Sequence, residues 1–202
     1  MEVRDTYLSI ASESRGTYRE KASRFIAVAM PAATEEEIRE KLDSLRKEYY
    51  DANHHCYAYR LGQSGDVYRL NDDGEPSGSA GRPIHGQIVS KGLSDVLVVV
   101  IRYFGGTKLG VPGLINAYRT AAAEALENAQ KIQKVLTDLF EVTFDYKEMN
   151  EVMRILKENG SAIIRQECDQ TCRILFSVRR SMSEKTVNRF TQRNLIYTSI
   201  NV

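Results

Sequence analysis

The side chains best suited to chemistry lie first in an acidic loop of this 202-residue chain. Asp72, Asp73 and Glu75 fall within four positions, and Ser79 and Arg82 follow. Clustered carboxylates can bind a metal ion or act as acid and base. Three other interpretations stay open: a solvated turn, because Asp-Gly is a common turn pair, a cap on the glycine-rich backbone, or an ion pair with Arg82. The spacing differs from that of an EF-hand, and no metal or other cofactor is predicted.

A second loop joins cations to aromatic rings. It reads Arg102-Tyr103-Phe104-Gly105-Gly106-Thr107-Lys108 and comes directly after the apolar run 96–101. Such a loop before a helix can hold an anion on backbone N–H groups, with Lys108 adding charge. Rings alternating with cations are typical of single-stranded nucleic-acid sites. In the alternative interpretation, the two rings fill core and the glycines permit tight packing. The order of a phosphate-binding P-loop is absent.

Histidine and cysteine offer a third possibility. His54 and Cys56 share one face of a predicted strand, because successive strand residues alternate between faces. His85 could join them as a zinc ligand, or could assist Cys56 as a nucleophile. No C-x-x-C pair accompanies them, so no zinc site is predicted. Cys168 and Cys172 flank a predicted hairpin turn and are expected to be reduced.

Composition limits the kind of partner. The formal net charge of +1 excludes bulk attraction to polyanions, so any nucleic-acid binding must come from a local patch. No apolar run approaches the roughly 18 residues of a membrane span, and the N-terminus lacks the apolar segment of a secretory signal. An odd count of three cysteines is typical of a reducing compartment. We therefore expect a cytoplasmic protein that does not bind membranes.

The elements that must position the two loops can be read from periodicity. Strands are predicted over 4–10, 14–30 with a polar break at 21–24, 54–61, 67–70 and 96–101. Thr34 with Glu37 fits a capping box for a helix carrying Ile38 and Leu42. Further helices are predicted from Arg82, with Pro83 at its first position, to Gly92, and from about 112 to 128.

The pattern changes after residues 131–134, which are predicted to form a junction. Strand, helix, strand, strand, helix and strand follow within about 65 residues, which is the ferredoxin-like βαββαβ order. The sequence thus predicts an α+β protein of two domains, 1–134 and 135–202.

Three blocks of sequence together resemble the YigZ/IMPACT family: HCYAYRLG, then NDDGEPSGSAGRPI, then VLVVVIRYFGGTKLGVPGLINAY. The resemblance covers essentially the whole chain. It implies an N-terminal α/β domain similar to the second domain of a small-subunit ribosomal protein. It also implies a C-terminal ferredoxin-like domain similar to one of elongation factor G.

The resemblance also implies where and what the chain binds. Eukaryotic members of this family regulate translation through protein contacts, and both implied folds suggest RNA or the ribosome. Two residues depart from the family pattern: His55 replaces an Asn, and Asn116 replaces an Arg, which should weaken anion binding. The residues expected to bind are Asp72, Asp73, Glu75, Ser79, Arg82, Arg102, Tyr103, Gly105, Gly106, Lys108 and Arg119, with His54 and Cys56 as secondary candidates.

Two functions remain open on the sequence. In the first, the chain is a non-catalytic, translation-associated regulator that binds RNA, the ribosome or a translation-related protein. In the second, it is a small-molecule enzyme that uses the acidic loop and His54 beside a glycine-lined cleft. The enzyme requires a pocket shared by these residues. Because the two loops carry opposite charges, they are expected to hold each other in place. No catalytic residue is assigned.

Overall fold

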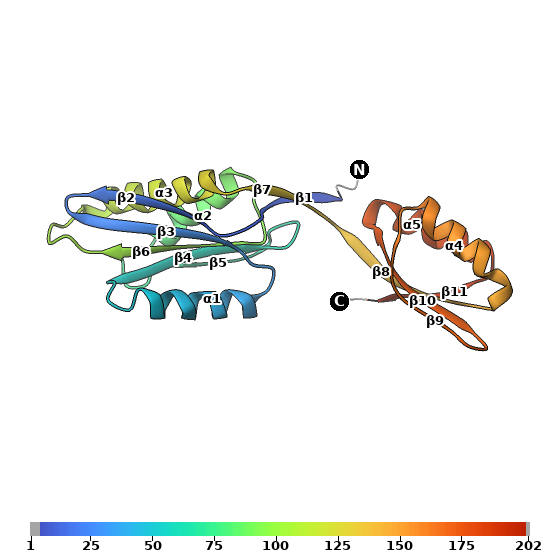
Figure 1. Ribbon diagram of the computed structural model, residues 1–202. Helices are drawn as coiled ribbons and strands as arrows, with labels where there is room; N and C mark the ends of the chain where they lie inside the picture. Colours follow the sequence, from blue (N-terminus) through green and yellow to red (C-terminus); the bar gives the residue numbers. More distant parts are fainter. Residues whose placement is uncertain (1–4, 201–202) are drawn as a thin grey trace. The chain divides into compact units, whose positions relative to one another are not determined.

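The computed structural model describes residues 5–200, and their contacts divide into two compact units (Figure 1). One unit is Tyr7–Lys134. The other joins Asp5 and Thr6 to the described residues from Val135 to Ile200.

The first unit is built on a five-stranded antiparallel sheet with strand order β2-β3-β6-β4-β5. The strands are β2 (Ser14–Glu20), β3 (Ser23–Pro31), β4 (His54–Leu61), β5 (Val67–Asn71) and β6 (Val96–Tyr103). The central strand β6 is buried along 96–102, as a continuously apolar strand covered on both faces should be. The predicted strands 14–30, 54–61, 67–70 and 96–101 are therefore present, with the first of them divided at Lys21 and Ala22.

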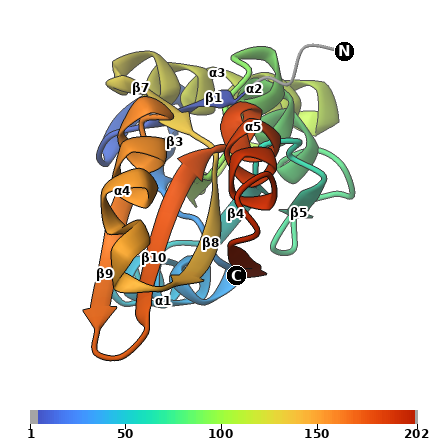
Figure 2. The same cartoon turned by 90° about the vertical axis from the view of Figure 1, so that its right-hand side faces the viewer.

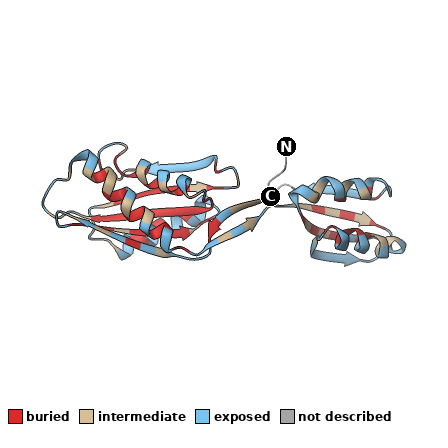
Figure 3. Cartoon of the chain, turned by 90° about the horizontal axis from the view of Figure 1, so that it is seen from above, coloured by how far each residue is buried: buried red, intermediate tan, exposed pale blue. Residues whose placement is uncertain are grey.

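Helices cover both faces of this sheet (Figure 1). Helix α1 (Glu35–Glu48) packs Ile38, Leu42 and Leu45 against one face. Helices α2 (Gly81–Ser90) and α3 (Gly110–Asn128) cover the other. Figure 3 shows that the buried residues follow the strands between these layers, which is where a three-layer protein places its core.

At the start of α1, the structure shows one of the two hydrogen bonds of the predicted capping box. The side chain of Thr34 accepts a hydrogen bond from the Glu37 N–H at 3.2 Å. The Glu37 carboxylate accepts from the N–H of Ala33, one residue before the cap, at 2.8 Å. Helix α2 differs more from expectation, because it begins at Gly81 and Pro83 is its third residue.

Helix α3 approaches the sheet closely through small residues. Ala121 and Ala125 are fully buried, and a Cβ on Gly16 of β2 would lie only 2.4 Å from the Ala125 backbone nitrogen. Glycine and alanine at these positions therefore set the distance between α3 and the sheet.

The predicted junction at 131–134 is part of a strand. Strand β7 (Lys131–Val135) pairs with β1 (Thr6–Ile10) in a separate two-stranded sheet. Lys134 also pairs with the buried Asp95 at 2.7 Å, and Tyr7 donates to the same carboxylate at 2.5 Å. Burial raises the pKa of Asp95, whereas the hydrogen bonds from Lys134 and Tyr7 lower it. The pKa of Asp95 is lowered overall. The division between the two units falls at Lys134 and Val135, as predicted, but the segment is a strand, which the sequence did not show because its partner β1 lies more than a hundred residues away.

The second unit has the predicted βαββαβ order. Its sheet runs β11-β8-β10-β9, formed by β8 (Thr137–Phe144), β9 (Ala162–Cys168), β10 (Cys172–Arg179) and β11 (Ile196–Ile200). Helices α4 (Met149–Glu158) and α5 (Arg180–Thr191) cover one face, as Figure 2 shows. A short 3-10 turn, η1 (Tyr146–Glu148), precedes α4. The ferredoxin-like expectation is confirmed.

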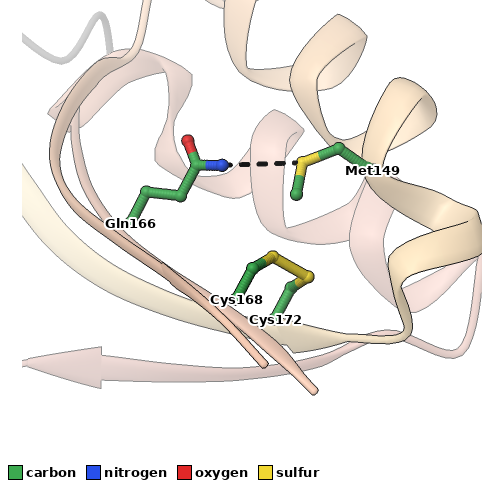
Figure 4. The surroundings of a disulfide bond; sticks show 4 residues. All are labelled: Met149, Gln166, Cys168 and Cys172. Atoms are coloured by element: carbon green, nitrogen blue, oxygen red, sulfur yellow. Dashed lines mark hydrogen bonds between the residues drawn. A yellow bond between two sulfur atoms is a disulfide. The ribbon is translucent and has the colours of Figure 1, made fainter. Parts of the chain in front are cut away.

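The two cysteines beside the β9–β10 turn are joined in a disulfide, which corrects the expectation that they are reduced (Figure 4). The ladder places Cys168 directly opposite Cys172, with their Cα atoms 4.1 Å apart. The sequence located the turn but not the register that brings the two sulfurs together. Cys56 is free and buried.

Across residues 5–200, every helix is too short or too polar to span a lipid bilayer.

Candidate functional site

The Asp72 carboxylate fixes the conformation of the acidic loop through hydrogen bonds to backbone N–H groups. One of its carboxylate oxygens accepts from the N–H groups of Ala80 and Gly81 at 2.9 and 2.8 Å, and the other accepts from Gly78 at 2.8 Å. These donors precede or begin α2, so the carboxylate caps the helix in place of the usual adjacent side chain. Ser79 is also used within the loop, since its hydroxyl donates to the Pro76 carbonyl at 2.6 Å.

Asp73 ties the loop to the start of β4. Its carboxylate accepts from the His55 N–H at 2.6 Å, and its carbonyl lies 2.7 Å from His54 Nδ1. Asp73 has a positive φ of 42°, and Gly74 follows with 86°. The loop thus turns through two left-handed residues, which explains the Asp-Gly pair.

Glu75 is the acid that points into the protein. Its side chain is only 4% exposed, and its Oε1 accepts from Arg102 Nη1 at 2.5 Å. The Arg102 side chain is 6% exposed, so both charges are removed from water. This pair links the two turn-rich loops, as their opposite charges predict. Burial on this scale is tolerated because each charge neutralises the other.

Two more buried groups extend this pair into a network. Tyr118 on α3 donates its hydroxyl to Glu75 Oε1 at 2.8 Å, and Cys56 Sγ lies 3.3 Å from that hydroxyl. Cys56 Sγ also lies 2.9 Å from the Asp72 carbonyl oxygen. Burial raises the pKa of the Cys56 thiol well above its ordinary value, which does not suit a nucleophile. Burial likewise raises the pKa of Tyr118, so both groups act as neutral hydrogen-bonding partners.

His54 lies at the edge of the network. Its Nε2 is 3.8 Å from Glu75 Oε1, beyond hydrogen-bond distance. His85, the other histidine considered with Cys56, is instead stacked on Tyr68 of β5 with ring centroids 4.8 Å apart. Within residues 5–200, no three His, Cys, Asp or Glu side chains are grouped as metal ligands.

A cavity of about 380 Å³ opens beside the Glu75–Arg102 pair. Its walls combine this buried pair with Lys108 and with apolar side chains. The lining residues are Glu75, Pro76, Arg102, Phe104, Lys108, Leu109, Gly110, Val111 and Leu114. The volume lies in the range of roughly 300–1,000 Å³ that small-molecule sites occupy. Asp72, Asp73 and His54 do not line it.

The wall of this cavity has three features suited to a ligand. Phe104 is 46% exposed, and the Arg102 guanidinium carbon lies 5.5 Å from the centroid of its ring. Lys108 is exposed and has no carboxylate within ion-pair distance among the described residues. Helix α3 begins at Gly110 without a side-chain cap, so the N–H groups of Gly110 and Val111 remain available to an anion, whereas Pro112 has none.

Three residues that were predicted to bind in the second loop, Tyr103, Gly105 and Gly106, do not line the cavity. Tyr103 faces the α1 side of the sheet, where its hydroxyl donates to Asp51 at 2.8 Å, because it alternates with Arg102 along β6. Gly105 lies against the β2–β3 turn, where a Cβ would be 2.1 Å from the Ala22 backbone. Gly106 adopts a φ of 83°.

Arg82 and Arg119 lie elsewhere on the same unit. They line a separate hollow of about 410 Å³ between α2 and α3, together with Gly78, Pro83, Gly86, Gln87 and Ile115. Arg119 donates to the Asn116 side chain at 2.9 Å. Of the predicted binding residues, Glu75, Arg102 and Lys108 line the first cavity, Arg82 and Arg119 line this second hollow, and the others line neither.

Sequence reasoning missed Tyr118, and it left Phe104, Leu109 and Val111 out of the predicted site. Tyr118 could have been found from the helical spacing of Leu114 and Ala121, which places it on the buried face of α3. A polar hydroxyl on that face needs a buried acceptor.

Comparison with known proteins agrees with this architecture. Residues 21–126 match the model of the Impact N-terminal domain. An IMPACT family member of Bacillus subtilis, YvyE, is 34% identical over 170 residues, covering 84% of this chain and 76% of the relative. A Protein IMPACT homolog of Schizosaccharomyces pombe is 34% identical over 124 residues, covering 59% and 44%. A crystal structure described as that of a hypothetical protein superposes with a TM-score of 0.75 at 25% identity, covering 98% of this chain and 99% of the other. The chain belongs to the IMPACT family.

Proposed function

We propose that this protein is a non-catalytic, translation-associated regulator that binds RNA, free or in the ribosome, through the first unit. The observation that carries the proposal is Lys108, an exposed cation without a carboxylate partner among the described residues, beside a cavity with an exposed aromatic ring. Cation, ring and helix N-terminus together suit a phosphate with its base. Membership of the IMPACT family supports a role in translation, and a cytoplasmic location is part of this proposal.

The state of the acids supports a binding role over catalysis. The carboxylates of Asp72 and Asp73 accept backbone N–H groups, and that of Glu75 accepts from Arg102 and Tyr118. A general acid or base needs access to the substrate proton. Glu75 does line the cavity, so the alternative of a small-molecule enzyme rests on this residue alone.

The second unit offers less to a nucleic acid. Phe140, Val142 and Phe176 face its helices, so their strand neighbours face away from them. Among the described residues, those neighbours on β8 and β10 are Leu139, Glu141, Thr143, Arg173, Leu175 and Ser177, without an aromatic ring. Sheets that bind RNA on an open face use aromatic side chains there. This favours the first unit as the RNA-binding part.

The test is the salt dependence of binding to purified ribosomes and to single-stranded RNA. We expect affinity to fall with salt, and Lys108→Gln to reduce the slope of log K against log salt by about one. Lys47→Gln, an exposed lysine of α1 on the other side of the sheet, is the control and should change nothing. Equal slopes for wild type and Lys108→Gln would exclude this site. A partner from lysate that resists nuclease would support a protein partner instead.

A further inference from the structure

Arg102 is an incompletely satisfied donor group in the wall of a cavity. Nη1 is the guanidinium nitrogen that has an acceptor among the described residues, and Nε is buried without one. A guanidinium carries five N–H donors in a fixed fork. Buried donors normally have partners, and one without a partner is a common mark of a ligand position.

The charge on Arg102 is already balanced. Glu75 lies 2.5 Å away, so the pair is neutral as a whole. A second anion within the cavity would meet the Glu75 carboxylate as well as the guanidinium. The acceptor that suits the remaining donors is therefore a neutral one, such as a carbonyl oxygen or a ring nitrogen.

The shape of the cavity favours a flat group. Phe104 is about half exposed, and Leu109, Val111 and Leu114 supply apolar contact. A planar heterocycle can stack on the ring while its edge atoms accept hydrogen bonds.

The rim of the cavity favours a negative charge, in contrast to its interior. Lys108 and the uncapped first turn of α3 lie at the same opening. A neutral planar ring within reach of a phosphate describes a nucleotide. We infer that this cavity binds one nucleotide, with its base against Phe104 and Arg102 and its phosphate at Lys108 and the α3 N-terminus.

This inference rests on the proposed RNA-binding function and makes it specific, since it assigns one unstacked base of a single strand to one cavity. It adds Phe104 and Val111 as residues that contact the base. A free nucleotide has the same chemistry, and the experiment separates the two sources.

The absence of tryptophan from the chain provides a direct probe. Phe104→Trp places a single indole in the cavity wall. We expect short single-stranded RNA of mixed sequence to quench the emission of this variant by stacking. The abasic form of the same strand should not quench. Phe104→Leu, which removes the ring, should weaken binding by about 5- to 150-fold, the range for one stacked base.

The second experiment blocks the cavity with a larger side chain and measures RNA binding. Val111→Trp places a bulky ring at the opening, and Val89→Trp on α2 is the control, since the two valines are 46% and 48% exposed. We expect Val111→Trp to weaken RNA binding as Phe104→Leu does, and Val89→Trp to bind as wild type.

The outcomes separate this inference from the proposed function. If RNA binds wild type, Phe104→Leu and Val111→Trp equally, the nucleotide cavity is excluded while RNA binding stands. If RNA does not bind at low salt but nucleoside 5′-monophosphates quench Phe104→Trp, the cavity holds a free nucleotide and the RNA function fails. If neither binds, both fail.

Discussion

Glu75 and Arg102 form a buried ion pair, 2.5 Å long, that joins the acidic loop to the end of the central strand. Removing one member leaves the other charged and away from water. We therefore expect Glu75→Gln to destabilise the protein by about 3–5 kcal/mol. Urea unfolding gives the free energy of unfolding.

The matched comparison for this pair is Arg102→Met, alone and combined with Glu75→Gln. The double variant should be more stable than the two single losses predict, with a coupling energy of about 1–3 kcal/mol. Additive losses would show that the two side chains act independently.

Asp72 caps three backbone N–H groups, those of Gly78, Ala80 and Gly81. Asp72→Ala should cost about 2 kcal/mol or more, because charge-assisted hydrogen bonds are among the strongest. Hydrogen exchange should accelerate at these three amides first. Asp66→Ala, at an exposed position before β5, is the control and should stay within about 0.5 kcal/mol of wild type. Unchanged exchange at the three amides would contradict the capping role.

Gly105 is required for close approach, whereas Gly86 is not. An alanine Cβ at Gly105 would lie 2.1 Å from the Ala22 backbone, but at Gly86 it would meet nothing within 4 Å. Gly105→Ala should destabilise by about 1–3 kcal/mol. Gly86→Ala, inside α2, should stabilise by up to about 1 kcal/mol. Thermal unfolding of both variants shows whether each substitution stabilises or destabilises the protein. A Gly105→Ala variant as stable as wild type would refute the close contact.

The Cys168–Cys172 disulfide closes a very short loop, with a sequence separation of four. Loop-closure entropy for such a loop is worth about 2 kcal/mol. Reduction should therefore accelerate hydrogen exchange in β9 and β10 while leaving β6 unchanged. Thiol alkylation before and after reduction checks that the bond forms. Cys168→Ser should show the same exchange without reductant and no further response to it, and a response would point to another cause.

His85 should make stability depend on pH. Burial lowers the pKa of His85, and the Arg60 charge lowers it further. The folded state thus binds a proton less readily than the unfolded chain, whose pKa is about 6.5. This contribution to stability is full above about pH 6.5 and is lost as the pH falls through the folded pKa. His85→Phe, which keeps a ring beside Tyr68, should flatten the curve of unfolding free energy between about pH 7 and 5. The pKa of His55 is also lowered by burial, and His55 contributes equally to the pH dependence of wild type and of His85→Phe. Equal curves of unfolding free energy against pH for these two proteins would therefore contradict the role of His85.

Much of the fold could be predicted because its signals are local. Thr34 caps α1, the apolar run 96–101 forms β6, and small residues mark the packed face of α3. The misread elements depend on distant partners. Lys131–Val135 becomes a strand through β1, and Cys168 meets Cys172 through a register that sequence spacing does not determine.

The candidate site shows the same division. Sequence composition located both loops and the opposite charges that join them. It did not indicate that β6 continues through Arg102 and Tyr103, which therefore face opposite sides of the sheet, or that Arg82 and Arg119 line a separate hollow. Those assignments depend on where β6 ends and on how α2 packs against α3.

The strand order β2-β3-β6-β4-β5 has a consequence for synthesis of the chain. The hairpins β2–β3 and β4–β5 leave the ribosome first, but each borders a gap that only β6 fills. A nascent chain that ends before Val96 therefore carries two unpaired apolar strand edges, which are prone to wrong pairing. Once β6 is inserted, it joins the hairpins and brings Arg102 to Glu75 at the same time. The contact between the two turn-rich loops is thus formed by the step that closes the sheet.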